Sequence, residues 1–214
     1  MQSIQLIPAR RVETELYDLN SRFITNAGPA FNVKEAQDFI GSIRNKYPDA
    51  SHHVPVYLIG HGASTVAHCS DDGEPSGTAG RPALAVLKGS GLGDVVLVIT
   101  SYFGGTKLGT GGLVRAYSDS VRNLLDGLPL ARKVATTCLM FVVPYALYEP
   151  TQLVIKNHLG SVRDEAFGAE VTLTVRLADE YLENFKNQMK ELTRGKVDFI
   201  TLSHSDNTIL PIQK

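Results

Sequence analysis

Three carboxylates lie within four residues of one another in a turn-rich stretch of the chain. Asp71, Asp72 and Glu74 belong to Ser70-Asp-Asp-Gly-Glu-Pro-Ser-Gly-Thr-Ala-Gly-Arg-Pro, thirteen residues dense in glycine, proline and serine. Carboxylates at this spacing suit acid–base chemistry or binding of a divalent cation. They are also ordinary turn residues and helix caps, and the spacing does not match an EF-hand loop. The residues therefore leave a catalytic and a structural role open.

Four histidines fall between residues 52 and 68. None of them has the His-Glu-x-x-His spacing of zinc proteases, and consecutive strand residues such as His52 and His53 face opposite sides. We therefore expect no metal site and no cofactor. His52 is a candidate for acid–base chemistry with the neighbouring carboxylates, and a hydrogen-bonded structural histidine is the alternative.

A second glycine-rich stretch has the composition of an anion-binding loop. Phe103-Gly-Gly-Thr-Lys-Leu-Gly-Thr-Gly-Gly follows an apolar run and brings Gly109, Gly111 and Gly112 to the start of an expected helix. Backbone N–H groups and the helix dipole favour an anion at such a position. It is not a Walker loop, because no Gly-Lys-Ser/Thr opens the helix. The alternative is that the glycines only permit close packing of strand and helix.

Both glycine-rich loops have basic residues within them or next to them in the sequence. Lys107 lies within the second loop, Arg115 follows it on the expected helix, and Arg81 closes the first loop. These three side chains are candidates for binding a sulfate, a phosphate or a nucleic-acid phosphate. Asp119 lies one helical turn beyond Arg115, where it would compete for that arginine.

The elements that position the two loops follow from hydrophobic periodicity and turn signals. Up to residue 127 we expect short strands around 12–16 and 23–24, a turn at 26–29, a helix at 33–47, strands at 53–59 and 64–68, a helix at 82–88, a buried strand at 95–102 and a helix ending at Gly127. Because both loops precede helices, we expect them to lie together and to form the functional surface.

After Lys133 the pattern starts again as a smaller unit. We expect a strand at 136–143, a helix at 148–159, two strands flanking Phe167-Gly168, a helix at 180–192 and a strand at 196–203. The order β-α-β-β-α-β is the ferredoxin-like arrangement. The sequence thus predicts an α/β domain at 1–132 and a ferredoxin-like domain at 133–214.

Composition limits the partners. The net charge is −1, from 21 Lys+Arg and 22 Asp+Glu, which argues against bulk electrostatic attraction to nucleic acid or membrane. The apolar runs are too short to span a bilayer, and the N-terminus lacks the order of a secretory signal. Cys69 and Cys138 form no Cys-x-x-Cys motif. We expect a reduced, cytoplasmic protein, and nothing in the sequence specifies its oligomeric state.

Two long motifs resemble the YigZ/IMPACT family. They are Asp71-Asp-Gly-Glu-Pro-Ser-Gly-Thr-Ala-Gly-Arg-Pro and Tyr102-Phe-Gly-Gly-Thr-Lys-Leu-Gly-Thr-Gly-Gly-Leu-Val-Arg-Ala-Tyr, at the separation typical of that family. The similarity runs from about Ser21 to Tyr117, and the C-terminal unit resembles the smaller domain of bacterial members. We take Thr78, Tyr102, Gly104 and Gly105 from these motifs as surface positions of the site.

The resemblance implies fold and function together. It implies a two-domain α+β fold, with an N-terminal domain like the second domain of ribosomal protein S5 and a C-terminal ferredoxin-like domain. That pair is similar to the last two domains of the translocating elongation factor, and eukaryotic relatives regulate translation through protein partners. The expected function is a translation-associated regulatory protein that binds RNA, the ribosome or a protein partner. The alternative is a hydrolase or phospho-ligand enzyme that uses Asp71, Asp72, Glu74 and His52.

Two short segments depart from the family pattern. Where the family usually has Ala-Thr-His-Asn-Cys-x-Ala-Tyr, this chain has Ala50-Ser-His-His-Val-Pro-Val-Tyr, so that Val54 replaces a cysteine, while His52 and Tyr57 carry over cleanly. Where it usually has Thr-Arg-Tyr-Phe, this chain has Thr100-Ser-Tyr-Phe. The loss of that arginine at Ser101 weakens the expected basic surface beside the second loop.

Overall fold

The computed structural model describes residues 5–212 and divides them into two compact units. Unit 1 comprises the chain up to Lys133 together with the residues from Ile209 onward, and unit 2 is Val134–Thr208. Both units are α+β, as predicted.

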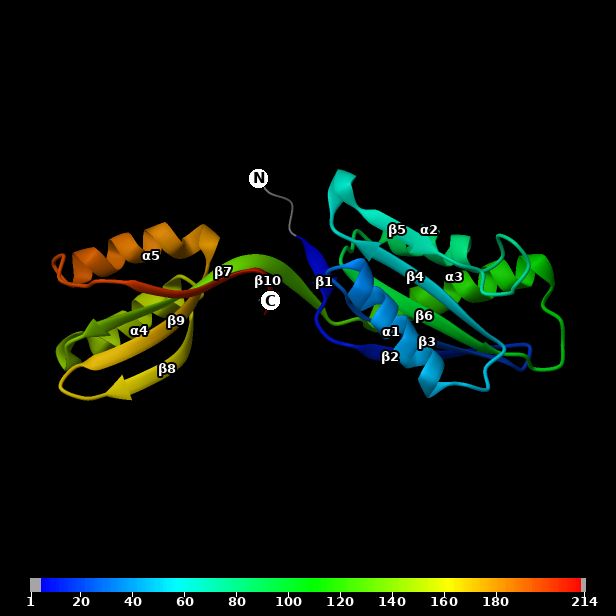
Figure 1. The fold of residues 1–214 in the computed structure, drawn as a ribbon, viewed down its shortest axis with the longest axis horizontal. Coiled ribbons are helices and arrows are strands. Elements are labelled where there is room, and N and C mark those ends of the chain that lie inside the picture. Colours follow the sequence, from blue (N-terminus) through cyan, green and yellow to red (C-terminus); the bar gives the residue numbers. More distant parts are fainter. Residues whose placement is uncertain (1–4, 213–214) are drawn as a thin grey trace. The chain divides into compact units, whose positions relative to one another are not determined.

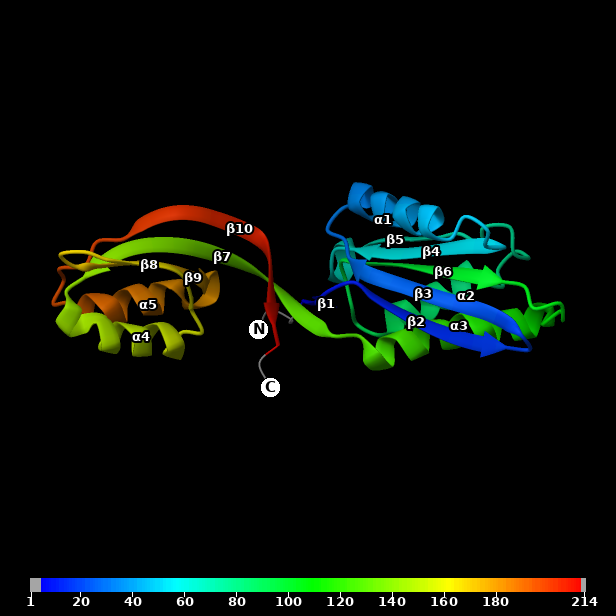
Figure 2. The ribbon, with the colours of Figure 1, turned by 90° about the horizontal axis from the view of Figure 1, so that it is seen from below.

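Unit 1 is a sheet between two layers of helix. The strands are β2 (Val12–Asp18), β3 (Ser21–Pro29), β4 (His52–Ile59), β5 (Val66–Cys69) and β6 (Val95–Tyr102). They are antiparallel throughout, in the order β2-β3-β6-β4-β5. Helix α1 (Val33–Lys46) covers one face, and α2 (Gly80–Gly89) and α3 (Gly109–Gly127) cover the other (Figure 1 and Figure 2).

The central strand β6 is buried over seven consecutive residues, Val95 to Ser101. Its near-continuous apolar run predicted this, because a strand with helices on both faces has no solvent side. Helix α1 likewise begins where expected: the Asn32 side chain accepts from the backbone N–H of Glu35 at 2.9 Å and caps the helix.

One turn prediction is wrong. Residues 26–29 continue β3 instead of forming a turn, paired with β6 from Asn26↔Val98 to Pro29↔Val95. A glycine is required in this strand because a Cβ on Gly28 would lie 2.9 Å from the side chain of Arg11. In this segment glycine is present because the Arg11 side chain packs closely against the strand, and not because the chain turns.

Unit 2 has the β-α-β-β-α-β order that the sequence predicted. It contains most of β7 (Leu130–Val143), α4 (Tyr148–Asn157), β8 (Ser161–Phe167), β9 (Val171–Ala178), α5 (Asp179–Leu192) and most of β10 (Ile200–Pro211). Strand β7 pairs with β9, with β10 and, at its first residues, with the short strand β1 (Leu6–Pro8). The final strand starts at Ile200, four residues later than expected.

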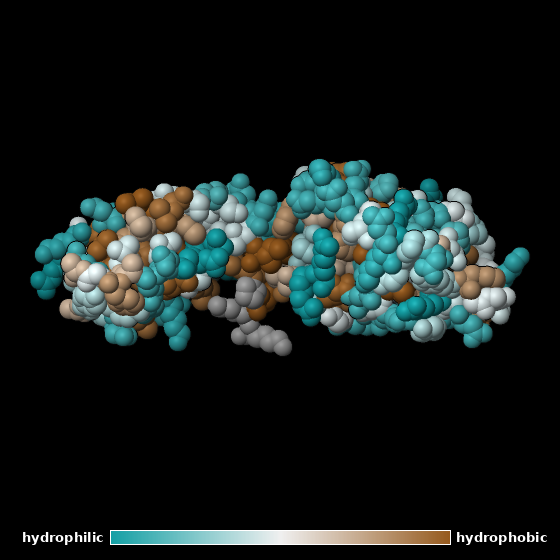
Figure 3. Space-filling model, turned by 60° about the horizontal axis from the view of Figure 1, so that its bottom comes forward, coloured by the Kyte–Doolittle hydropathy of each residue, from teal (hydrophilic) through white to brown (hydrophobic). Residues whose placement is uncertain are grey.

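Helices α4 and α5 cover one face of the unit 2 sheet, where they enclose a separate core (Figure 2). Figure 3 shows apolar side chains exposed on this unit, and within Val134–Thr208 the large exposed ones on β7 and β10 are Val142, Ile200 and Leu202.

Because each unit has its own core, we predict that a core truncation in one unit leaves the other intact. Leu173 and Leu97 are both fully buried, in unit 2 and unit 1 respectively. Leu173→Ala should lower the stability of unit 2 by about 2–5 kcal/mol. Hydrogen–deuterium exchange should then lose protection in β9 and α5 while β6 and α3 keep theirs. Leu97→Ala is the matched reverse experiment, and loss of protection in both units from either change would argue for one cooperative domain.

Candidate functional site

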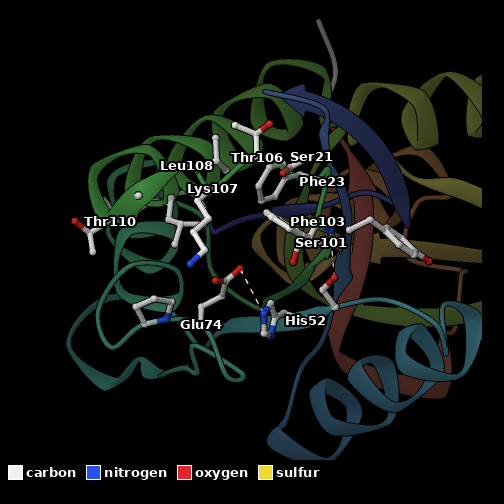
Figure 4. A pocket seen from close by; sticks show the side chains of 15 residues that line it. Ser21, Phe23, His52, Glu74, Ser101, Phe103, Thr106, Lys107, Leu108 and Thr110 are labelled. Atoms are coloured by element: carbon white, nitrogen blue, oxygen red, sulfur yellow. Dashed lines mark hydrogen bonds and ion pairs between the residues drawn. The ribbon is translucent and has the colours of Figure 1, made fainter.

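The two glycine-rich loops line one pocket of about 380 Å³ on unit 1 (Figure 4). They therefore lie together, as expected. The first loop contributes Glu74 and Pro75, and the second contributes Phe103 and residues 106–110. Strands β3, β4 and β6 supply Ser21, Phe23, His52, Ser101 and Tyr102, and the rest of the wall is Ser51, just before β4, and Leu113 of α3.

Strand register places three of these side chains in one row. Ser101 on β6 pairs with Phe23 on β3 and with His52 on β4. Directly opposed residues of antiparallel strands point to the same face, so the three side chains form one side of the pocket. The other side is formed by the loops that lead into α2 and α3.

A hydrogen-bonded chain ends at the Glu74 carboxylate. The Tyr117 hydroxyl lies 2.7 Å from Glu74 Oε1 and 3.2 Å from Ser101 Oγ. A carboxylate only accepts, so the phenol donates its single proton to Glu74 and the Ser101 hydroxyl donates to the phenol oxygen. Burial is the main cause that raises the pKa of Tyr117 far above its usual range, and Glu74 raises it further. Tyr117 therefore remains a neutral donor.

His52 presents one defined nitrogen to Glu74. Its Nδ1 lies 2.8 Å from the backbone oxygen of Asp72 and must carry a proton, because a carbonyl only accepts. Its Nε2 lies 3.9 Å from Glu74 Oε1 (Figure 4). In the neutral ring Nε2 is an acceptor, so a backbone contact fixes the tautomer that faces the carboxylate.

Asp71 has a structural role. Its carboxylate accepts backbone N–H groups from Gly77, Ala79 and Gly80 at 2.8, 3.2 and 2.8 Å. These bonds hold the first loop closed and cap α2, which has no capping side chain of its own. Burial alone would raise the pKa of the Asp71 carboxyl, but the three donors and Arg81 outweigh it and lower that pKa. Asp71 does not line the pocket.

Asp72 anchors the same loop on its other side. Its carboxylate accepts from the Arg44 guanidinium at 2.6 Å and from the backbone N–H of His53 at 2.7 Å. It also lies outside the pocket lining. Of the four acid–base candidates, the structure therefore brings only His52 and Glu74 together in the pocket.

Thr78 is not a surface position, which corrects that expectation. Its side chain and its backbone N–H both donate to the Pro75 oxygen, at 2.7 and 3.0 Å, and the residue is buried. Gly104, from the same set, is required by packing, because a Cβ there would lie 2.1 Å from the backbone of Asn20. Gly105 is exposed with φ +87°, and Tyr102 lines the pocket.

Of the three predicted cationic residues, only Lys107 lines the pocket. Lys107 and Gly109 line the pocket, whereas Arg81, Gly111, Gly112 and Arg115 do not. Asp119 pairs with Arg122 at 2.6 Å. Within the described residues Lys107 and Arg115 form no ion pair.

Sequence reasoning missed several residues of the site. Tyr117 stands with Ala116, Val121 and Leu124 in the apolar stripe of α3, a pattern that by itself predicts a core residue. The available signal was its hydroxyl, because a buried tyrosine generally needs a hydrogen-bond partner. Ser21, Phe23, Ser51 and Pro75 had no such signal, since only the strand register and the loop path bring them to the pocket.

Comparisons with known proteins agree with this architecture. Residues 19–125 match the Impact N-terminal domain family, and residues 141–196 match a domain of unknown function, DUF1949. The IMPACT family member YigZ of Escherichia coli (strain K12) is 35% identical over 92% of this chain and 97% of its own length. The IMPACT family member YvyE of Bacillus subtilis (strain 168) is 33% identical over 87% and 85%.

Solved structures add a similarity of fold. A crystal structure of a hypothetical protein is 34% identical, covers 95% of this chain and 99% of its own, and superposes with a TM-score of 0.63. The two-domain translational regulator Yih1 is 18% identical with a TM-score of 0.36, which is too low to transfer function.

The bonds of Asp71 predict a pH-dependent contribution to stability. Asp71→Ala leaves three backbone donors without their acceptor and should lower the free energy of unfolding at pH 7 by about 1–3 kcal/mol. Because the folded pKa is lowered, this contribution is complete above the unfolded pKa of about 3.9 and is lost as pH falls through the lower folded value. Urea unfolding at pH 7 and near pH 2 measures the difference.

The control for this prediction is Asp119→Ala, which removes an exposed pair with Arg122. It should change stability by less than about 0.5 kcal/mol at either pH. An Asp71→Ala effect that is equally small, or that does not shrink in acid, would contradict the role assigned to Asp71.

Proposed function

The chain belongs to the IMPACT family, and we propose that it is a translation-associated regulatory protein that binds a partner at the pocket between its two glycine-rich loops. The observation that carries the proposal is the convergence of both loops, the longest family-like motifs in the chain, on one pocket. Loops positioned by a rigid sheet are a common place for binding function. The family resemblance also implies a likeness to the last two domains of the translocating elongation factor, and this implied likeness supports a role in translation.

Two features favour a protein partner over RNA. The charged group buried in the pocket wall is the Glu74 carboxylate, which repels phosphate. Only Lys107 among the predicted cations lines the pocket, whereas phosphate binding normally uses several clustered Lys and Arg. RNA contact is the other outcome of the experiment below.

We place the protein in the cytoplasm. Cys69 and Cys138 are both free thiols, which suits a reducing compartment. Among residues 5–212, no helix is both long enough and apolar enough to cross a membrane.

The partner-binding proposal predicts a specific effect of Phe103, a pocket side chain that is 60% exposed. Phe103→Ala should reduce binding at least tenfold without changing the unfolding midpoint, because an aromatic anchor in an interface is typically worth more than 1 kcal/mol. Binding is measured by sedimentation with purified ribosomes and with ribosome-free translation factors. Phe167→Ala in unit 2, where Phe167 is 59% exposed, is the matched control.

The salt dependence of that binding separates the partner classes. A protein partner predicts a shallow slope that Lys107→Ala leaves nearly unchanged. A loss of about 10³-fold or more between 50 and 200 mM salt, flattened by Lys107→Ala with Arg115→Ala, would favour RNA. Binding by Phe103→Ala at the level of the parent would contradict the proposal.

A second candidate is a hydrolase, favoured by the fixed His52 tautomer. With Nδ1 bound to the Asp72 oxygen, Nε2 is available beside Glu74 for general-base activation of water. This candidate predicts turnover of ester or phosphoester substrates that falls at least 100-fold in both His52→Gln and Glu74→Gln. Turnover that survives both changes would come from a contaminant.

A further inference from the structure

We infer that the pocket recognises a guanidinium group, the side chain of an arginine presented by the partner protein. This inference names the recognised group of the proposed function and rests on it.

The first support is the state of Glu74. Its side chain is only 11% exposed, and its one hydrogen bond in the described structure comes from the neutral Tyr117 hydroxyl on Oε1. The Nε2 atom of His52 lies 3.9 Å from Oε1, beyond hydrogen-bond distance, and no residue of the described chain donates a hydrogen bond to Oε2. A largely buried carboxylate with one neutral donor is strongly stabilised by a cation that brings further hydrogen bonds.

The second support is the set of acceptors around that carboxylate. His52 Nε2 accepts in the neutral ring, and Ser101 Oγ keeps its lone pairs because its proton is donated to Tyr117. A guanidinium carries five N–H donors in a planar fork and binds several acceptors at once. An ammonium is a compact and strongly hydrated charge, which fits this spread of acceptors less well.

The third support is the apolar part of the wall. Phe23, Phe103, Leu108 and Leu113 line the same pocket. An arginine has a three-carbon apolar stem that packs along such side chains, and its planar head stacks on aromatic rings. The volume of about 380 Å³ is ample for one such side chain.

Ser101 provides the space for this group. It lines the pocket and is 4% exposed, so any longer side chain at this position has to extend into the cavity beside Glu74.

Lys107 is the competing cation. Its side chain extends toward Glu74 in Figure 4 but is exposed and forms no ion pair within 4.0 Å among the described residues. For a guanidinium site Lys107 is a rival, whereas for an anion site it is a ligand. Removal of the Lys107 charge should therefore raise the affinity for a guanidinium, whereas it would lower the affinity for an anion.

The test uses the purified full chain and titration followed by NMR amide shifts. The probes are an acetylated, amidated pentapeptide with one central arginine, the same peptide with lysine, free L-arginine and inorganic phosphate. We expect the arginine peptide to bind at least tenfold more tightly than the lysine peptide, with shifts at His52, Glu74 and Ser101. Comparable binding of free L-arginine would place the recognition in the guanidinium alone, whereas preference for the peptide would add contacts to its backbone.

Three variants decide the chemistry. Glu74→Gln keeps an acceptor for Tyr117 and should weaken the arginine peptide at least tenfold, while Glu183→Gln, at an exposed glutamate of α5, should have no effect. Ser101→Arg should abolish peptide binding. Lys107→Gln should tighten it about two- to fivefold, and thermal unfolding confirms that each variant is folded.

Three results would overturn the inference: equal affinity for the arginine and lysine peptides, a Glu74→Gln variant that binds like the parent, or phosphate binding that Lys107→Gln removes. The outcome is separable from that of the proposed function. If Phe103→Ala removes partner binding but Glu74→Gln does not, the proposed function stands and the guanidinium site is wrong. If the chain binds the arginine peptide but neither ribosomes nor translation factors, the guanidinium site stands and the proposed function is wrong.

Discussion

The Asp71 carboxylate and the three backbone N–H groups that it binds are the constraint on which the site depends. The first loop has no strand or helix of its own between β5 and α2, so its backbone groups need a partner from a side chain. Asp71 supplies that partner for Gly77, Ala79 and Gly80 together and fixes where α2 begins. With the loop closed in this way, Glu74 projects into the pocket and not into solvent.

Asp72 and His52 extend the same constraint to the sheet. The Asp72 carboxylate binds the backbone of β4 and Arg44 of α1, and its own carbonyl oxygen fixes the His52 ring. The loop can approach this closely because Gly73 has φ +92° and its Cα lies over the ring, where a Cβ would be 3.2 Å from His52 Nδ1. Gly73 therefore allows the first loop to approach His52 closely enough for the Asp72 carbonyl to orient its ring.

Sequence reasoning reached the fold because long-range order here follows from local signals. The Asn32 cap and the buried run of β6 each reflect capping or burial within a few residues. The roles of the carboxylates could not be read in the same way. The Asp71 carboxylate accepts from backbone N–H groups six to nine residues away, whereas the Asp72 carboxylate accepts from the backbone of β4. Two neighbouring aspartates thus have different partners, and only the folded loop determines which. The turn predicted at 26–29 is wrong because packing against Arg11 selects glycine there.

Most charged side chains of the first loop bind groups within the fold and do not face the pocket. The Asp71 carboxylate binds backbone N–H groups, the Asp72 carboxylate pairs with Arg44, and Arg81 helps to lower the pKa of Asp71. None of Asp71, Asp72 and Arg81 lines the pocket. What remains inside is Glu74, held by a tyrosine whose raised pKa keeps it a donor. Around that carboxylate stand hydrogen-bond acceptors and apolar rings, while the one lysine of the lining is exposed. A site that seemed anion-binding from its glycines therefore has the polarity of a cation site at its inner wall, and this polarity is set by the bonds that close the first loop.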